Sequence, residues 1–487
     1  MALPIGAFLR RKPLDHIISK SNEHGMRRVL GPFSLIALGV GTTIGAGLFS
    51  LTGVAAAQNA GPAVVVAFLI AAIACGFAGL CYAELASMIP VAGSAYTYTY
   101  TTMGELVAWI IGWDLVLEYT VGAATVAVSW SDYLSSALHQ WGFRPDPRWL
   151  ASPMTQVALP GGGTAHGWIN TPAVFAITAV TALLLRGISE SAAVNSIVVV
   201  LKLAVVAAFM AFCAPHIDTA HYHPFLPPND GHFGHFGISG VMRAAGMIFF
   251  AYLGFDIIAT TAQETRNPER TMPIGILGSL GICTLIYIAF SLVLTGVVDY
   301  RTMLNDGSPV ATAIDVTHLF WLQSAIKFSI LFGYISVLMG LMLGQVRVFF
   351  AMAHDGLIPA LFGKLHPRTR APALSHLIFL VVTSLLAGLV PISTLGNMTS
   401  IGTLLAFVLV CVGVLILRLR EPDRPRAFRA PGGIITPVLG IASCGAVMMS
   451  LDGLTWLRLI LWLALGLIIY GVYGLKHSFL AQSENGL

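Results

Sequence analysis

Gly39-Val-Gly-Thr-Thr-Ile-Gly-Ala-Gly-Leu-Phe-Ser-Leu-Thr-Gly53 is a glycine-rich stretch inside an apolar run that covers residues 33–57. The run is long enough to cross the roughly 30 Å hydrocarbon core of a bilayer. Each glycine, however, weakens a helix by about 1 kcal/mol relative to alanine. The pattern has two interpretations: a helix opened at mid-membrane to bind an anion on free N–H groups, or a close-packing face built on Gly41 and Gly45. The stretch by itself leaves both open.

The composition is that of a polytopic membrane protein. Of 487 residues, 56% are hydrophobic and 10% are charged, with a mean hydropathy of +0.81, whereas a soluble domain carries about 25% charged residues. The net charge of +4 does not indicate nucleic-acid binding. The six cysteines lie in apolar spans without zinc-site spacing, so no disulfide, metal site or cofactor is expected. Residues 1–30 are basic and lack the apolar core of a cleaved signal peptide.

Twelve apolar spans can be marked along the chain. They cover residues 33–57, 62–89, 103–138, 171–186, 194–214, 240–262, 273–298, 321–353, 374–390, 397–419, 434–450 and 456–474. With the N-terminus placed in the cytoplasm, most of the 26 Lys and Arg residues fall on the cytoplasmic side of these spans. The positive-inside rule therefore predicts an all-α protein with twelve transmembrane helices and both termini cytoplasmic.

An internal repeat is indicated by irregularities that the two halves share. The first span is interrupted by glycines, and the sixth is interrupted at Phe249-Phe-Ala-Tyr-Leu-Gly-Phe-Asp256. The third and eighth spans are both unusually long, which repeats the pattern at an offset of five spans. Because five is odd, the second copy enters the membrane from the opposite side, and the two interrupted helices mark a midplane binding site. The predicted parts are a cytoplasmic segment 1–30, a first repeat 31–214, a second repeat 215–430, and two peripheral helices with the C-terminus, 431–487.

Ionisable residues at membrane depth are costly and usually functional. Lys202 lies roughly 12 Å from the nearer end of its span, farther than its side chain comfortably reaches. Glu118 lies near the middle of the long third span, and Asp256 follows the interruption of the sixth. A proton-coupling role is favoured for Lys202, whereas functional and structural roles are weighted equally for Glu118 and Asp256. Glu84, near the end of the second span, is expected to be a satisfied interfacial acid.

Five motifs resemble those of a known family. They are Thr43-Ile-Gly-Ala-Gly-Leu-Phe49, Cys81-Tyr-Ala-Glu-Leu-Ala-Ser-Met-Ile-Pro-Val-Ala-Gly-Ser-Ala-Tyr96, Gly112-Trp-Asp-Leu-Val-Leu-Glu-Tyr119, the segment 264–273, and Arg347-Val-Phe-Phe-Ala-Met-Ala-His-Asp-Gly-Leu-Ile-Pro359. Together they are similar to the cationic amino acid transporter family of the amino acid–polyamine–organocation (APC) superfamily. The resemblance covers about residues 30–475 and identifies the chain as a bacterial member.

The resemblance implies a leucine-transporter-type fold with a five-plus-five inverted repeat, broken first and sixth helices, and alternating access in the bacterial inner membrane. It also implies that the carboxylate of the substrate meets one set of backbone groups and its amine another. These sets are Ile44, Gly45, Ala46 and Gly47, and Phe250, Ala251, Leu253 and Gly254. Phe250 matches a gating aromatic, and Lys202 matches a lysine that fills the place of a sodium ion. Family members often carry Thr at the position of Ala46, so a hydroxyl contact is absent here.

The residues and the resemblance together predict a secondary active transporter that imports L-amino acids with protons. An exchanger or uniporter without net proton coupling is the alternative, and a membrane-bound amino acid sensor is less favoured. An enzyme is not indicated, because the spans contain no catalytic motif such as H-E-x-x-H. The expected partners are the amino acid, protons and the lipid bilayer, and a small membrane-protein partner stays open. Tyr252, Met339 and Met342 would line an apolar end of the pocket, which favours small neutral substrates.

Overall fold

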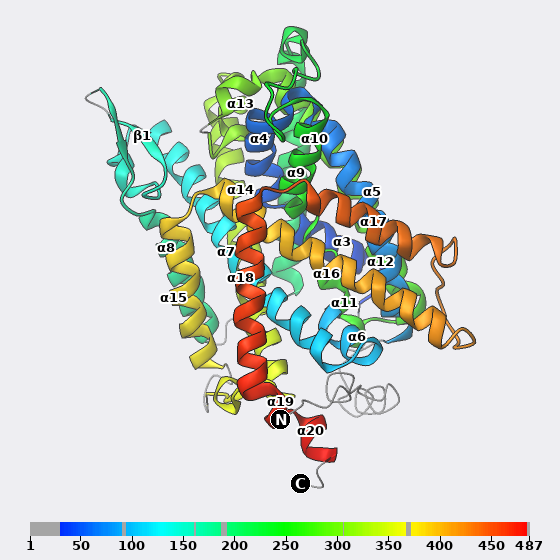
Figure 1. Ribbon diagram of the computed structural model, residues 1–487. Coiled ribbons are helices and arrows are strands. Elements are labelled where there is room, and N and C mark those ends of the chain that lie inside the picture. Colours follow the sequence, from blue (N-terminus) through cyan, green and yellow to red (C-terminus); the bar gives the residue numbers. More distant parts are fainter. Residues whose placement is uncertain are drawn as a thin grey trace.

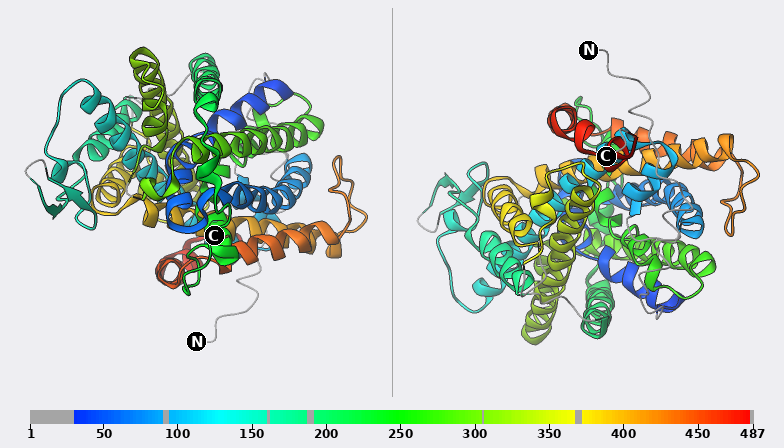
Figure 2. Two further views of the ribbon diagram at one scale, coloured as in Figure 1. Left: turned by 90° about the horizontal axis from the view of Figure 1, so that it is seen from above. Right: turned by 90° about the horizontal axis from the view of Figure 1, so that it is seen from below.

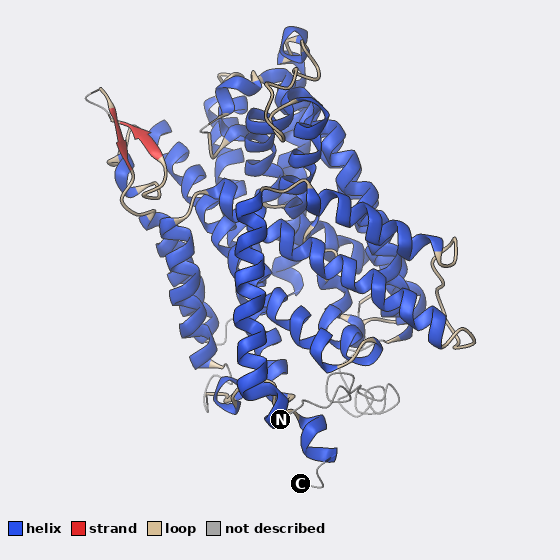
Figure 3. Cartoon of the chain, in the orientation of Figure 1, coloured by secondary structure: helices blue, strands red, loops and turns tan. Residues whose placement is uncertain are grey.

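The computed structural model describes residues 30–89, 94–159, 162–186, 192–304, 306–366 and 372–484. These residues are almost entirely helical (Figure 3), and the only sheet among them is an antiparallel hairpin in which Gln156 pairs with His166 and Ala158 with Thr164. Residues 1–29 of the predicted N-terminal segment and residues 90–93 of the second motif lie outside the described residues.

The chain passes first through the elements of the predicted first repeat. They are α3 (Pro32–Thr43), η1 (Gly47–Leu51), α4 (Thr52–Ala55), η2 (Ala56–Ala60), η3 (Gly61–Ala63), α5 (Val64–Met88), α6 (Ser94–Thr102), α7 (Glu105–Gln140), η4 (Pro147–Trp149), β1 (Gln156–Ala158), β2 (Thr164–His166), α8 (Thr171–Leu185) and α9 (Ala192–Cys213). Two short turns, η5 (Ala214–His216) and η6 (Thr219–Tyr222), follow.

The remaining elements belong to the predicted second repeat and to the C-terminal part. They are α10 (Gly237–Ile248), η7 (Phe249–Tyr252), α11 (Ile257–Thr260), η8 (Ala262–Glu264), α12 (Pro268–Val297), η9 (Tyr300–Met303), α13 (Pro309–Asp315), α14 (Phe320–His354), η10 (Ala360–Gly363), α15 (Ala373–Leu389), α16 (Ile392–Arg420), α17 (Ile435–Met449), α18 (Gly453–Ile469), η11 (Tyr470–Gly474), α19 (Leu475–His477) and α20 (Phe479–Glu484).

Eight helical segments of the described chain are long and apolar enough to cross a membrane. They are Gly47–Met88, Glu105–Gln140, Ser196–His216, Gly237–Ala259, Pro268–Val297, Phe320–His354, Ile392–Arg420 and Gly453–Ala481. Four shorter apolar helices, α3, α8, α15 and α17, fall in the predicted first, fourth, ninth and eleventh spans. This is the architecture of a multi-pass helical membrane protein.

The helices form a bundle with two ends that are easily distinguished in Figure 1. The upper end carries α13 and the β1–β2 hairpin, and the lower end carries α6, α19 and α20. α8 packs against α15 at one edge, and the loop between α16 and α17 lies at the opposite edge (Figures 1 and 2). In the interior, the long helices α7 and α14 pack against each other, and α12 packs against both α3 and α5. α3 leads into the first helix break, and α7 and α12 carry further residues of the candidate site.

The C-terminal helix α18 is fastened to α7 by two tryptophans. Trp113 Nε1 donates to the carbonyl oxygen of Trp462 at 2.9 Å, and Trp462 Nε1 donates to that of Trp113 at 3.0 Å. The two rings stack with centroids 4.5 Å apart. Because each indole N–H is satisfied by the other residue, a mostly lipid-exposed helix is held at a fixed position on the bundle.

Candidate functional site

The first helix breaks where the glycine-rich stretch predicts. α3 ends at Thr43, and Ile44 has extended backbone angles (φ −74°, ψ 107°) before the helix resumes at Gly47. Within the described part of the chain, the N–H groups of Gly45 and Ala46 reach no backbone carbonyl. Free N–H groups at the start of a resumed helix are suitable partners for an anion. The open-helix interpretation is therefore favoured over a packing face alone.

The second break is built differently. α10 gives way to the short turn η7, after which Leu253 is extended (ψ 131°) and Gly254 has φ +126°, a conformation that favours glycine. Asp256 Oδ1 accepts a hydrogen bond from the Gly254 N–H at 3.1 Å. Ser400 Oγ on α16 accepts one from the Phe250 N–H at 3.1 Å. Side-chain oxygens thus satisfy backbone groups that the break exposes.

The two breaks pack directly against each other. A Cβ on Gly47 would lie 2.3 Å from the Cα of Ala251, so the approach requires glycine at this position. The hydroxyl of Tyr287, from α12, lies 2.7 Å from the carbonyl oxygen of Ala251 and 3.0 Å from that of Thr43. One hydroxyl donor is therefore shared between the two breaks. The structure brings the two predicted sets of substrate-binding residues, one from each break, to the same place in the bundle.

Lys202 reaches a carbonyl that the first break leaves without its usual donor. In an unbroken helix, the carbonyl oxygen of Gly41 would accept from the N–H of Gly45. It accepts instead from Lys202 Nζ at 2.7 Å. The lysine is 3% exposed, and its stem lies against α14, where a Cβ on Gly333 would approach Lys202 Cε to 3.0 Å. The ammonium thus links α9 to the end of α3 inside the bundle.

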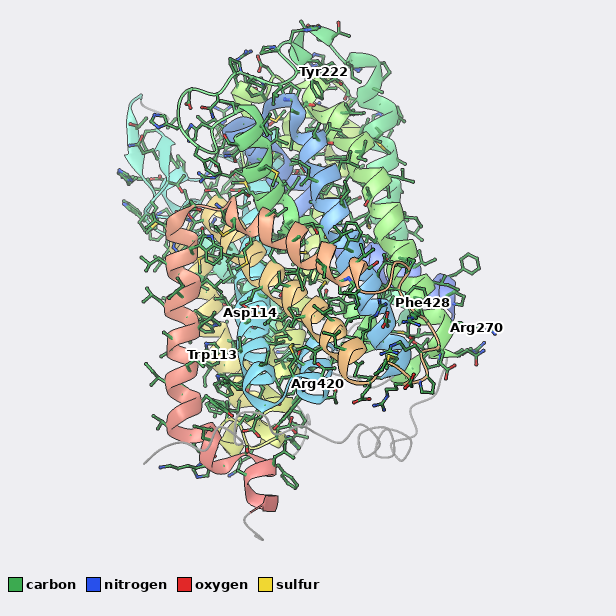
Figure 4. All side chains as sticks on the ribbon, turned by 45° about the vertical axis from the view of Figure 1, so that its right-hand side comes forward. Trp113, Asp114, Tyr222, Arg270, Arg420 and Phe428 are labelled. Atoms are coloured by element: carbon green, nitrogen blue, oxygen red, sulfur yellow. The ribbon has the colours of Figure 1, made fainter. Side chains whose placement is uncertain are left out.

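The acidic residues near the site have separate contacts. Glu118 and Asp114, one turn apart on α7, are buried against Gly402 of α16, and Figure 4 labels Asp114 within the bundle. Among the described residues, neither carboxyl group has a hydrogen-bond partner. Glu118 therefore forms no ion pair with Lys202 in this structure. Asp256 accepts from the Gly254 N–H at the second break. No direct hydrogen bond therefore joins Lys202, Glu118 and Asp256 in the described part of the chain.

The residues predicted to line the pocket lie in different surroundings. The ring of Phe250 lies against α7, because a Cβ on Gly122 would meet Phe250 Cε2 at 3.5 Å. Tyr252 turns toward α5, where its hydroxyl donates to the carbonyl oxygen of Phe68 at 3.1 Å. Met339 and Met342 are both buried on α14. Phe250 thus lies beside α7 and the two methionines are buried on α14, whereas the Tyr252 hydroxyl is bonded to α5.

Sequence reasoning missed the neutral hydroxyl groups of the site. Tyr287 and Ser400 lie in apolar helices, where a single tyrosine or serine gives no periodic signal. Glu84, by contrast, was singled out from the sequence: it is fully buried and accepts from Arg418 Nε at 3.0 Å and from the Ala430 N–H at 2.8 Å. The expectation that Glu84 is a satisfied acid is confirmed.

Residues 30–472 match the amino acid permease family. That range contains both helix breaks and Lys202. The chain belongs to the amino acid permease family. The predicted resemblance to the APC superfamily is confirmed, and the members of this family are transporters rather than enzymes.

The permease has relatives with different named substrates. It is 41% identical over 480 residues to the branched-chain amino acid permease BcaP of Bacillus subtilis (strain 168), which covers 98% of this chain and 100% of the relative. It is 38% identical over 476 residues to the methylthioribose transporter of the same organism, with 98% and 100% covered. It is also 38% identical over 424 residues to the vacuolar cationic amino acid transporter 4 of Arabidopsis thaliana, with 86% and 68% covered. Amino acid transport is the activity that most of these names share.

Proposed function

We propose that the permease imports L-amino acids together with protons by alternating access. The observation that carries the proposal is the direct packing of two helix breaks with complementary backbone groups. The N–H groups of Gly45 and Ala46 suit a carboxylate. Carbonyl oxygens near Phe250, Ala251 and Leu253 suit an ammonium group, because each carbonyl has a second lone pair even where it already accepts one hydrogen bond. An amino acid backbone carries both groups at the required short separation.

Alternating access requires two parts that move relative to each other, and we assign them to a five-plus-five inverted repeat. Residues 31–214 and 215–430 form the repeats, α17 and α18 lie outside them, and the chain crosses the membrane twelve times. The corresponding breaks support this assignment, as do the corresponding long helices α7 and α14, with 36 and 35 residues. The distribution of Lys and Arg supports cytoplasmic termini in a bacterial inner membrane, so that the upper end in Figure 1 faces outward.

Proton coupling is assigned to Lys202. Its ammonium is stabilised inside the bundle by the carbonyl oxygen of Gly41. A movement of the first helix away from α9 would remove that acceptor and reduce the stabilisation of the buried charge, which favours release of the proton. Binding and release of a proton would then accompany closing and opening of the site. Glu118 and Asp256 are the next candidates for carrying the proton, because both are buried carboxyl groups. Glu118 lies on α7, and Asp256 lies at the second break.

The substrate is proposed to be a small neutral L-amino acid. Phe250 at the second break and Met339 and Met342 on α14 are buried apolar residues, and we assign them to the wall of the pocket. Glu118 is the buried acid that could bind a cationic side chain, and we do not assign it to the substrate. The name of the relative BcaP, a branched-chain amino acid permease, supports a neutral substrate, whereas the plant relative is named for cationic amino acids.

Uptake into proteoliposomes tests the proposal. The purified permease is given labelled alanine, valine, leucine, arginine and methylthioribose, with and without an imposed inward proton gradient. We expect uptake of neutral amino acids that the gradient accelerates. Uptake that ignores the gradient but increases when the liposomes are preloaded with amino acid would establish exchange instead. Uptake of methylthioribose alone would overturn the proposal that amino acids are the substrate.

A further inference from the structure

A cavity of about 360 Å³ lies at the upper end of the bundle, apart from the two breaks. Its walls come from the helix that follows the first break, from α7, from the loop around the β1–β2 hairpin, from Leu304, Asp306 and Gly307, and from the start of α16. Val54 and Gln58 line it from the first helix, which places it roughly 10–16 Å beyond Gly47 along that helix. The volume falls within the range of about 300–1,000 Å³ that is typical of small-molecule sites.

Two carboxylates face this cavity, and they are not equivalent. Asp306 already accepts from the Ser308 N–H at 2.8 Å and from Thr312 Oγ1 at 2.5 Å. Asp132, on α7, is partly buried and lines the cavity without such backbone and hydroxyl donors among the described residues. The two groups are close, because a Cβ on Gly307 would lie 2.0 Å from Asp132 Oδ2, and they interact electrostatically. No Lys or Arg of the described chain lines the cavity to offset them.

We propose that this cavity is a binding site for an organic ammonium ion of amino acid size, occupied before the substrate reaches the two breaks. Asp132 and Asp306 would bind the ammonium group as an ion pair in a partly desolvated site. Gln58 and Ser393, also on the wall, can donate hydrogen bonds to a carboxylate, and Val128 and Ile392 provide apolar surface for a side chain. The ligand class therefore includes zwitterionic and cationic amino acids and excludes acidic ones.

A metal ion fits the cavity less well than an organic cation. A hard metal ion needs several oxygen ligands that converge on one point. The described residues contain no group of three or more His, Cys, Asp or Glu side chains placed to hold a metal. The mixed polar and apolar wall instead suits a ligand that is charged at one end. The inference rests on the proposed function only in taking the upper end as the outer face, from which the substrate arrives.

A reporter cysteine on the cavity wall can show whether the cavity attracts cations and whether it binds an organic ammonium ion. All six native cysteines are buried, so Ser393→Cys supplies one thiol on the cavity wall. Its rate of modification is compared for a cationic and an anionic methanethiosulfonate reagent, in the presence and absence of n-butylammonium or butyrate. Val390→Cys, on the same wall, is the second reporter if Ser393→Cys does not fold. Neither reporter requires that the protein transport anything.

We expect the cationic reagent to be favoured and n-butylammonium, but not butyrate, to slow modification. In the double variant Asp132→Asn/Asp306→Asn, the ratio of the modification rates for the cationic and the anionic reagent should fall about tenfold. Protection of the thiol by n-butylammonium should disappear. Asp299→Asn is the matched control, since Asp299 is an acid outside the cavity paired with Arg301 at 3.2 Å, and it should change neither result. The proposal is overturned if n-butylammonium fails to protect the reporter, or protects it equally in the double variant.

Failure of this inference is distinguishable from failure of the proposed function. Gly47→Leu, which blocks the site at the two breaks, should leave protection by n-butylammonium unchanged. If Gly47→Leu removes the protection, the amine binds at the breaks and not in the cavity, and the inference is wrong. A permease that failed to accumulate amino acids in proteoliposomes would overturn the proposed function. Protection of the reporter thiol would still show whether the cavity binds the amine.

Discussion

The two helix breaks satisfy their backbone groups with different chemistry. At the first, the carbonyl oxygen of Gly41 accepts from a buried ammonium group, Lys202 Nζ. At the second, the acceptors and donors are the Ser400 hydroxyl, the Tyr287 hydroxyl and the adjacent carboxylate of Asp256. An ammonium donor can be lost with its proton, whereas a neutral hydroxyl keeps its donor at every physiological pH. We therefore propose that the first break is the proton-sensitive one and that the hydroxyl groups hold the geometry of the second.

The largest expected effect comes from forcing the two breaks apart. Gly47→Leu should abolish substrate binding, because even a Cβ at this position would lie 2.3 Å from Ala251 Cα. Gly47→Ala should also impair binding, whereas Gly45→Ala should be tolerated, since its Cβ would meet only a Val337 methyl at 3.5 Å. Substrate-induced thermal stabilisation measures the difference. Gly76→Leu, at a position with open space around the Cβ, is the control for insertion and folding.

Wild-type stabilisation by substrate in Gly47→Leu would contradict the account of the first break. The glycine-rich stretch would then be a packing surface between helices, and the substrate would bind elsewhere. Loss of stabilisation in the Gly76→Leu control as well would indicate a general folding defect of leucine variants. The milder pair would then test the first break, since Gly47→Ala should weaken substrate binding and Gly45→Ala should not.

A smaller effect is expected at the shared hydroxyl of the second break. Tyr287→Phe removes the donor that lies between the carbonyl oxygens of Ala251 and Thr43, and a buried polar group left unsatisfied costs about 1–3 kcal/mol. Thermal stability should fall and substrate affinity should decrease by about tenfold. The ratio of uptake with and without a proton gradient should stay as in the wild type. A selective loss of the gradient effect would move proton sensitivity to the second break.

The sequence predicted both breaks because glycines and an interrupted apolar run are visible locally. It predicted a functional role for Lys202, because a lysine deep in an apolar span is energetically costly. It could not predict that Gly41 would be the partner of Lys202, since that contact joins residues 161 positions apart. Tyr287 was missed for a related reason, because a hydroxyl acquires its role only when two breaks are brought to either side of it.

Substrate preference tests whether either break offers a free acid to a cationic side chain. Asp256 Oδ1 already accepts from the Gly254 N–H, and we propose that Glu118 does not contact the substrate. Alanine should therefore compete for labelled substrate at least as well as arginine. Arginine that outcompetes alanine more than tenfold, a difference of about 1.4 kcal/mol, would show that a carboxylate reaches the bound side chain.

The smallest effect is expected from Asp256→Asn. An asparagine keeps an Oδ1 acceptor for the Gly254 N–H, so the backbone of the second break should stay in place. Substrate affinity and the response to a proton gradient should change by less than about twofold, within roughly 0.4 kcal/mol. Asp256→Ala is the matched comparison, because it removes the acceptor and should weaken binding. Loss of the gradient response in Asp256→Asn would identify Asp256 as a proton carrier.

The central claim is that the proton is carried at the first break by Lys202. Lys202→Gln keeps a polar side chain with an N–H donor for the carbonyl oxygen of Gly41, but it cannot titrate. Accumulation of labelled alanine is measured in proteoliposomes with and without an inward proton gradient, beside substrate binding by thermal stabilisation. We predict that Lys202→Gln still binds alanine and loses the acceleration by the gradient. Undiminished gradient-driven accumulation in Lys202→Gln would contradict the account.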